Sequence, residues 1–256
     1  MLPFRGANFF KSVALLVQAP ASAGEIAFAG RSNTGKSSAI NALAGHRLAQ
    51  VSKTPGRTRL INYYAIGGER FLVDLPGYGY ARVPDAVRAP WEELLGGYLQ
   101  TRAPLRGLAL VMDVRHPLTE LDRRMLGWFR PTGKPIHVLL TKADKLSREA
   151  GRTVLRRVES EVAALAPGAS VQLFSSPKKT GLEEAAAVLV RWLAEGSPRQ
   201  SASLGEPEMK TPGKTGGLEI KAPGLKGEIS PGQNALRFKA PRSGRRSGRR
   251  PKPSVA

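Results

Sequence analysis

Residues 25–45 read EIAFAGRSNTGKSSAINALAG and combine a short apolar run, a glycine-bounded loop and a segment of helical length. The loop matches the pattern G-x-x-x-x-G-K-[ST] from Gly30 to Ser37. In such a loop the glycines let the backbone approach a phosphate, whose oxygens are held by backbone N–H groups and by the positive end of the following helix. The lysine reaches the β- and γ-phosphates and the serine hydroxyl binds Mg²⁺. The pattern lies between a predicted strand and a predicted helix, so we expect a site for ATP or GTP.

Apolar runs and segments of helical length alternate outward from this stretch, over residues 20–196. The runs are short and nearly continuously apolar, as in strands buried on both faces, and span 25–30, 70–77, 105–114, 135–144 and 171–176. The helical segments span 35–45, 85–102, 119–130, 148–165 and 181–195. Residues 60–66 predict a further strand, paired with 70–75 as a hairpin through Gly67 and Gly68. This order predicts an α/β three-layer fold, with a mostly parallel sheet, one antiparallel hairpin strand and helices on both faces.

Two further segments could complete a phosphate site. DLPG (74–77) ends a predicted strand, where the Asp74 carboxylate can hold Mg²⁺ through water and Gly77 can present its N–H to a γ-phosphate. SKTPGRT (52–58) occupies the place of a loop that senses the γ-phosphate in GTP hydrolases, and Thr54 or Thr58 could supply a second hydroxyl to Mg²⁺. The alternatives are an ordinary turn and a solvated basic loop.

The segment TKAD (141–144) points to the base of the nucleotide. The carboxylate of Asp144 can accept both N1–H and N2–H of guanine, and adenine offers no such donor pair. Lys142 can lay its stem over the base. A backbone N–H of FSS (174–176) can bond guanine O6. These segments favour GTP over ATP, the alternative being that TKAD only begins the next helix.

Composition limits the partners and the compartment. The 256 residues include 40 Lys+Arg, 20 Asp+Glu and no Cys, and the net charge of +20 favours a nucleic acid partner over an anionic membrane. A hydrophobic content of 41% excludes a wholly disordered chain, and the absence of Cys excludes a disulfide framework. No apolar run reaches 18 residues, so no transmembrane helix is expected. The N-terminal apolar run from Val13 to Val17 is shorter than the apolar core of a signal peptide, which has roughly 7–15 residues. We therefore expect a cytoplasmic protein.

The composition also divides the chain into an N-terminal extension (1–22), a domain (23–196) and a tail (197–256). The tail holds 13 Lys/Arg and 4 Glu, a net charge of +9, and is rich in Pro and Gly. Such a segment buries too little apolar surface to offset its ordering entropy, so we expect it to be disordered. It is either a solubilising tail or an RNA-binding arm.

The chain resembles a known family in the order and spacing of six segments: GRSNTGKSSAINAL, SKTPGRTRLINYY, VDLPGYGYARVP, MDVRHPLTELD, LLTKADKL and FSSPKKTGL. They are similar, over about residues 8–195, to the EngB (YihA/YsxC) ribosome-biogenesis GTPases of the TrmE–Era–EngA–EngB–Septin class. The resemblance implies a Ras-like P-loop GTPase domain that binds GTP and GDP and hydrolyses GTP with Mg²⁺. It further implies action in assembly of the large ribosomal subunit, whose precursor, with its rRNA and ribosomal proteins, would be the partner. A role in cell division and septation, and a monomer off the ribosome, are also expected.

The same resemblance assigns site residues by motif. Ser37 and Thr58 would bind the metal, and Lys36, Thr58 and Gly77 would act in catalysis. The nucleotide site would comprise Gly30, Arg31, Ser32, Asn33, Thr34, Gly35, Lys36, Ser37, Gly56, Arg57, Thr58, Arg59, Leu60, Asp74, Leu75, Pro76, Gly77, Thr141, Lys142, Ala143, Asp144, Phe174, Ser175 and Ser176.

Two residues suggest how hydrolysis is controlled. Tyr78 stands where Ras-like enzymes have a water-positioning glutamine, so we expect slow intrinsic hydrolysis. Asn33 resembles the residue that binds K⁺ in potassium-activated relatives, the alternative being a polar residue that caps its own turn.

Two other functions are weighed against the GTPase. A P-loop ATPase or small-molecule kinase needs no guanine-reading carboxylate, so TKAD argues against it. A basic RNA-binding scaffold without catalysis needs no phosphate machinery, so the presence of Lys36, Ser37 and Asp74 argues against it.

Overall fold

The computed structural model describes residues 3–50, 60–79 and 94–195. The segment 52–58 and the tail 197–256 therefore lie outside the described residues. The helix predicted over 85–102 is described only from residue 94, and residues 94–101 are helical.

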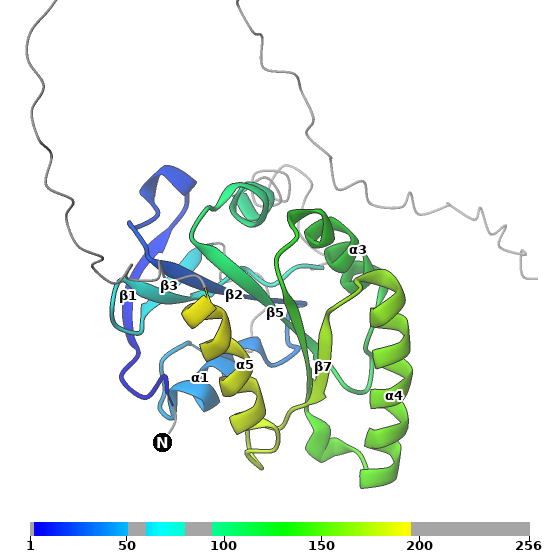
Figure 1. Cartoon of the computed structure of the whole chain (residues 1–256). Helices are drawn as coiled ribbons and strands as arrows, with labels where there is room; N and C mark the ends of the chain where they lie inside the picture. The colour runs from blue at the N-terminus through cyan, green and yellow to red at the C-terminus, as the bar shows by residue number, and fades with distance from the viewer. Residues whose placement is uncertain (1–2, 51–59, 80–93, 196–256) are drawn as a thin grey trace, which may run out of the picture. The chain divides into compact units, whose positions relative to one another are not determined.

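Seven described strands form one sheet in the order β1-β3-β4-β2-β5-β6-β7 (Figure 1). Neighbours from β4 to β7 pair in parallel, whereas β3 pairs antiparallel with both β4 and β1. Among the described strands β3 is therefore the one that runs against the others, which confirms the predicted hairpin strand. The strands are β1 (Asn8–Val13), β2 (Gly24–Gly30), β3 (Ile61–Ala65), β4 (Arg70–Asp74), β5 (Leu105–Asp113), β6 (Ile136–Thr141) and β7 (Ser170–Leu173).

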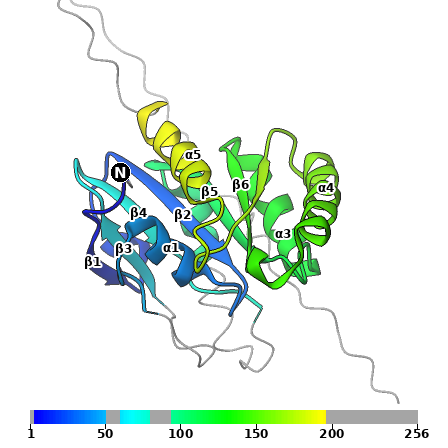
Figure 2. The same cartoon turned by 90° about the horizontal axis from the view of Figure 1, so that it is seen from below.

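Helices cover both faces of the sheet, which confirms the predicted three-layer α/β fold. Helices α1 and α5 lie on one face, and the helix at 94–101, α3 and α4 lie on the other (Figures 1 and 2). Their bounds are α1 (Lys36–Ala44), α3 (Glu120–Phe129), α4 (Arg148–Leu165) and α5 (Leu182–Glu195), with short 3₁₀ helices at Leu16–Gln18, Arg130–Thr132 and Ala143–Lys145. In the described part of the chain, no helix combines the length and the apolar character that a membrane crossing requires.

Strand β5 shows why the central runs are continuously apolar. Leu108, Leu110 and Met112 belong to the core beneath α3 and α4, whereas Ala109 and Val111 belong to the core beneath α1 and α5. Successive side chains of a strand point to opposite faces, so a strand covered on both sides needs an apolar residue at every position.

The N-terminal strand differs from the sequence prediction. The pattern of apolar runs predicts the first strand at residue 25, but β1 pairs with β3 at the edge of the sheet. Phe9 and Phe10 of β1 are mostly exposed, so the strand lacks the pattern of a buried run. Its place is set by distant contacts, since Ser12 Oγ donates to Asn62 Oδ1 at 2.6 Å. Phe4, just before β1, is buried in the core beneath α1 and α5.

Candidate functional site

Four predicted segments follow β2, β4, β6 and β7, whose carboxyl ends meet at one edge of the sheet. In open α/β sheets this edge is where ligands bind. The segments are 30–37, 74–77, 141–144 and 174–176, and hydrogen bonds join them as described below.

The loop between β2 and α1 has a shape that requires glycine. A Cβ on Gly30 would lie 2.5 Å from the carbonyl oxygen of Val111, and Gly35 adopts a left-handed conformation with φ of 100°. Thr34 closes the turn by donating from Oγ1 to the carbonyl of Arg31 at 2.8 Å. No side chain caps the N-terminus of α1, and its first turn has no acidic residue. Its first N–H groups therefore fit an anionic ligand.

The segment after β4 packs directly against this loop. Tyr78 N donates to the carbonyl of Gly30 at 3.2 Å, and Ser32 N donates to the carbonyl of Tyr78 at 3.2 Å. A Cβ on Gly77 would lie 3.3 Å from the backbone N of Ser32, so the two backbones pass as closely as a glycine permits. The result is that Asp74, at the end of β4, faces the start of α1.

Lys36 and Asp74 form an ion pair in which both side chains are buried. A buried amine and carboxylate at this edge fit a phosphate and a hydrated cation, the ligands expected from the sequence. Ser37, half-buried, directly follows the lysine. Within the described ranges no group of three His, Cys, Asp or Glu could hold a metal alone.

The TKAD segment is tied to the phosphate loop by side chains. Thr141 Oγ1 donates to the carbonyl of Thr34 and, at 2.9 Å, to that of Met112. Lys142 Nζ donates to the carbonyl of Asn33 at 2.7 Å, while its backbone is left-handed with φ of 60°. These contacts place the two predicted motifs side by side.

Asp144 is held by the segment that follows β7. Ser175 Oγ donates to Asp144 Oδ1 at 2.7 Å, and Ala143 N donates to the carbonyl of Phe174 at 3.1 Å. The hydrogen bond from Ser175 lowers the pKa of Asp144, so the carboxyl stays ionised at neutral pH. Ser176, half-buried, completes the segment. An oriented carboxylate is the group needed to accept two N–H bonds from guanine.

Asp113, at the end of β5, is a site residue for which the sequence predicts no role. Its carboxylate accepts hydrogen bonds from Arg115 Nη2 at 2.7 Å and forms an ion pair with Lys142 Nζ at 2.9 Å. Burial raises the pKa of Asp113, but the hydrogen bonds from Arg115 and Lys142 outweigh burial and hold that pKa well below its usual range. Asp113 thereby positions Lys142. In the sequence, the one indication of this role was that Asp113 is an acidic residue at the carboxyl end of a predicted strand.

Tyr78 is turned toward α3. Its hydroxyl donates to Asp122 Oδ1 at 2.8 Å, and Asp122 Oδ2 also accepts from Thr119 N and Oγ1. Burial and the neighbouring Asp122 raise the pKa of Tyr78 well above its usual value. Tyr78 therefore links the segment after β4 to the N-terminal cap of α3.

The remaining predicted residues are placed as follows. Asn33 has φ of 64°, and its side chain forms no hydrogen bond with a described residue, so the predicted capping of its own turn is not seen. Leu60 is exposed just before β3. Gly56, Arg57, Thr58 and Arg59 lie outside the described residues.

Comparisons with known proteins agree on one family. The family model described as 50S ribosome-binding GTPase matches residues 25–142. A probable GTP-binding protein EngB from Methylobacillus flagellatus is 60% identical over 192 residues, which are 74% of this chain and 93% of the relative. A protein of the same description from Laribacter hongkongensis is 55% identical over 214 residues, or 82% and 96% of the two chains.

Solved structures support the fold. The crystal structure of a probable GTP-binding protein engB aligns with a TM-score of 0.54 and 22% identity, covering 67% of this chain and all of that one (100%). The structure of Aquifex aeolicus Era Y63A bound to GDP.AlF4- aligns with the same TM-score of 0.54 and 20% identity, covering 66% of this chain and 56% of that one.

Proposed function

This chain belongs to the EngB family of GTP-binding proteins, and from that premise we propose that it is a magnesium-dependent GTP switch in assembly of the large ribosomal subunit. As a member of this P-loop GTPase family it binds guanine nucleotides and hydrolyses GTP. The main support for the proposal is that the Lys36–Asp74 ion pair and the Asp144–Ser175 hydrogen bond lie at the same edge of the sheet.

The phosphate end of the site would be served by residues 30–37 and 74–77. On nucleotide binding, Lys36 would leave Asp74 for the β- and γ-phosphates, and Gly77 would offer its N–H to the γ-phosphate. Ser37 and Thr58 would ligate Mg²⁺, with Asp74 holding it through water. The cation would neutralise the charge that develops on the phosphates. Asn33, whose side chain forms no hydrogen bond with a described residue, would be available to K⁺.

The base end would be read by residues 141–144 and 174–176. Asp144, oriented by Ser175, would accept from guanine N1–H and N2–H, and a backbone N–H of 174–176 would bond O6. Lys142, held by Asp113, would cover the ring with its stem.

Hydrolysis would be slow without a partner. The hydroxyl of Tyr78 is engaged by Asp122, so no side chain at this position is free to orient the attacking water. We propose that the GTP form binds the large-subunit precursor, that the precursor completes the site, and that hydrolysis releases the protein. The description of the matching family model as a ribosome-binding GTPase and the net charge of +20 support this partner. Action as a monomer in the cytoplasm, and an influence on cell division and septation, belong to the same proposal.

The test is co-sedimentation with large ribosomal subunits and their precursors in GTP, GDP, ATP or no nucleotide. We expect binding in GTP and Mg²⁺ only, and we expect Lys36→Ala to abolish it. The matched control is Arg156→Ala, which removes a cation exposed on α4. Circular dichroism would verify that both variants fold. Equal affinity for GTP and ATP would favour the ATPase alternative, and binding independent of nucleotide would favour a basic scaffold.

A further inference from the structure

A hydrogen-bonded chain of polar side chains lies between β6, β7 and the start of α5. His137 and Gln172 are both buried, and they stand among the apolar residues of β6 and β7. His137 Nε2 donates to Gln172 Oε1 at 2.8 Å, and His137 Nδ1 accepts from Ser170 Oγ at 2.7 Å. Gln172 Nε2 donates to the carbonyl of Gly181 at 2.6 Å. Buried polar groups cost free energy unless they are hydrogen-bonded, so these contacts fix the side-chain amide of Gln172 in one orientation.

The carbonyl of Gly181 marks the end of the loop that follows β7. Ala185 N also donates to this carbonyl, at 3.1 Å, so the hydrogen bonding of α5 begins there. Gly181 has φ of 70°, and a Cβ at this position would overlap Gln172 Nε2 and the carbonyl oxygen of Leu173. The end of the loop therefore lies directly against β7, and the amide of Gln172 holds it there.

The loop 174–181 carries residues of the predicted guanine site. Ser175 N donates to the carbonyl of Thr180 at 3.0 Å, which joins the two ends of the loop. The hydroxyl of Ser175 donates to Asp144 Oδ1 at 2.7 Å. Thr180 is bonded to Gly181 in the chain, so the position of Ser175 depends on where Gly181 is held.

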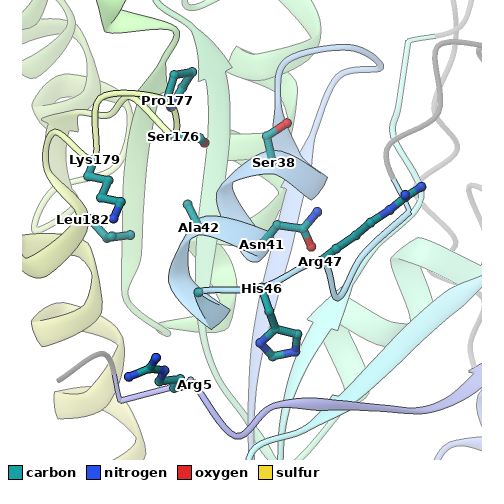
Figure 3. A pocket seen from close by; sticks show the side chains of 11 residues that line it. Arg5, Ser38, Asn41, Ala42, His46, Arg47, Ser176, Pro177, Lys179 and Leu182 are labelled. Carbon is teal, nitrogen blue, oxygen red and sulfur yellow. The ribbon is translucent and has the colours of Figure 1, made fainter.

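Packing does little to hold this loop. Residues 177–180 are exposed, and Figure 3 shows Ser176, Pro177 and Lys179 on the loop that faces α1. Residues of the loop and of α1 line a cavity of about 700 Å³ rather than a packed interface. Because the exposed residues bury little apolar surface, the hydrogen bonds at the base of the loop determine its geometry.

We propose that Gln172 is a positioning residue for guanine recognition. By holding the end of the loop at Gly181, it keeps Ser175 where its hydroxyl orients the carboxylate of Asp144. His137 contributes by fixing the amide of Gln172. The inference rests on the proposed function, in which Asp144 accepts N1–H and N2–H of guanine. It adds a buried residue that sets the alignment of that carboxylate without touching the nucleotide.

The experiment measures the affinity of the full chain for GDP and for inosine diphosphate (IDP) by calorimetry in Mg²⁺. Hypoxanthine keeps N1–H but lacks the N2 amino group, so the ratio of GDP to IDP affinity reports the second hydrogen bond to Asp144. The test variant, Gln172→Met, keeps an unbranched side chain but removes the amide. A hydrogen bond to a charged group contributes roughly tenfold to an affinity, and misalignment removes part of it, so we expect the ratio to fall about fivefold.

Kinetics of GTP hydrolysis supply a second readout. The phosphate contacts lie on other segments, so Gln172→Met should raise KM about fivefold or more and leave kcat within about twofold. A second variant, His137→Leu/Gln172→Met, replaces both partners of a buried hydrogen bond by apolar groups, which is often nearly neutral for stability. It should lower the affinity ratio to the same extent, and circular dichroism would verify that both variants fold.

The matched control is Tyr98→Phe, which also removes one buried hydrogen bond. The hydroxyl of Tyr98 donates to Glu25 Oε2 at 2.8 Å, and Glu25 lies near the amino-terminal end of β2, away from the nucleotide edge. The control should change the free energy of unfolding but leave the affinity ratio and KM as in the unmodified chain. If Gln172→Met behaves like this control, Gln172 serves stability alone and the proposal is wrong.

Combined substitutions test the route through Ser175. Ser175→Ala removes the hydroxyl that reaches Asp144, so it should lower the affinity ratio by itself. If Gln172 acts through Ser175, adding Gln172→Met to Ser175→Ala should lower the ratio no further, whereas additive effects would overturn the proposal. Equal affinity of the unmodified chain for GDP and IDP is a separate outcome. It would contradict the guanine contact in the proposed function itself.

Discussion

Replacing Tyr78 by Phe removes one hydroxyl that links the segment after β4 to α3. That hydroxyl donates at 2.8 Å to Asp122, whose side chain is almost wholly buried. A hydrogen bond to a charged group contributes about 1.5–3 kcal/mol, and the orphaned carboxylate oxygen has no access to water. We therefore expect Tyr78→Phe to lower the free energy of unfolding by about 1.5–3 kcal/mol in a urea titration. The matched control is Tyr64→Phe, because Tyr64 is buried but its hydroxyl forms no hydrogen bond with a described residue.

The same variant tests the role of Tyr78 in hydrolysis. Because its hydroxyl is engaged by Asp122, intrinsic GTP turnover per folded molecule should stay within about twofold of the unmodified chain, corresponding to under about 0.5 kcal/mol in the barrier. Turnover is measured by phosphate release at a temperature where both proteins are folded. A tenfold loss of kcat would show that Tyr78 acts on the attacking water. A stability change no larger than that of Tyr64→Phe would show that the bond to Asp122 contributes little.

Four further predictions follow from the site and the sequence. Asp144→Asn should weaken GTP binding at least tenfold, since a charge-assisted bond of about 1.5–3 kcal/mol is lost, and calorimetry showing unchanged affinity would contradict the guanine contact. If Asn33 holds K⁺, hydrolysis should be faster in KCl than in NaCl, and equal rates would remove that role alone. Truncation after Gly196 should lower the salt slope of RNA binding by about three and leave GTP affinity unchanged, and an unchanged slope would indicate a merely solubilising tail. Burial lowers the pKa of His137, so the neutral form is favoured in the folded state. Stability should then fall below pH 6.5, by at most about 1.4 kcal/mol at pH 5.5, and His137→Gln should flatten that part of the urea-derived profile.

The central fold could be predicted because its signals are local. Strand β2, the phosphate loop and α1 follow one another without interruption, and α4 begins and ends where the helical pattern does. Ser147, which caps α4 by accepting from Ala150 N at 3.2 Å, stands directly before that pattern. The four motif segments could be expected to meet because parallel strands end at one edge of a sheet.

The features that the sequence did not reveal depend on distant partners. Strand β1 has no buried run of its own, and its position depends on β3. In the sequence, Asp113 and Asp122 look like ordinary acidic residues near the end of a strand and the start of a helix. Their roles arise from Lys142 and Tyr78, which lie far away in the sequence but close in the folded sheet.

The pairing of β1 with β3 has a consequence for how the chain folds as it is synthesised. β1 leaves the ribosome before β3, and the hydrogen bond of Ser12 can form only after Asn62, 50 residues later, has been synthesised. The two strands of the β3–β4 hairpin, which is closed through Gly67 and Gly68, are adjacent in the sequence and can pair as soon as both are synthesised. Because local contacts cost less closure entropy than distant ones, the hairpin should form first and then receive β1 along its free edge. Pulse-labelled hydrogen exchange during refolding should then show protection of the β3 and β4 amides before those of β1, so that β1, although synthesised before β3, would dock after it.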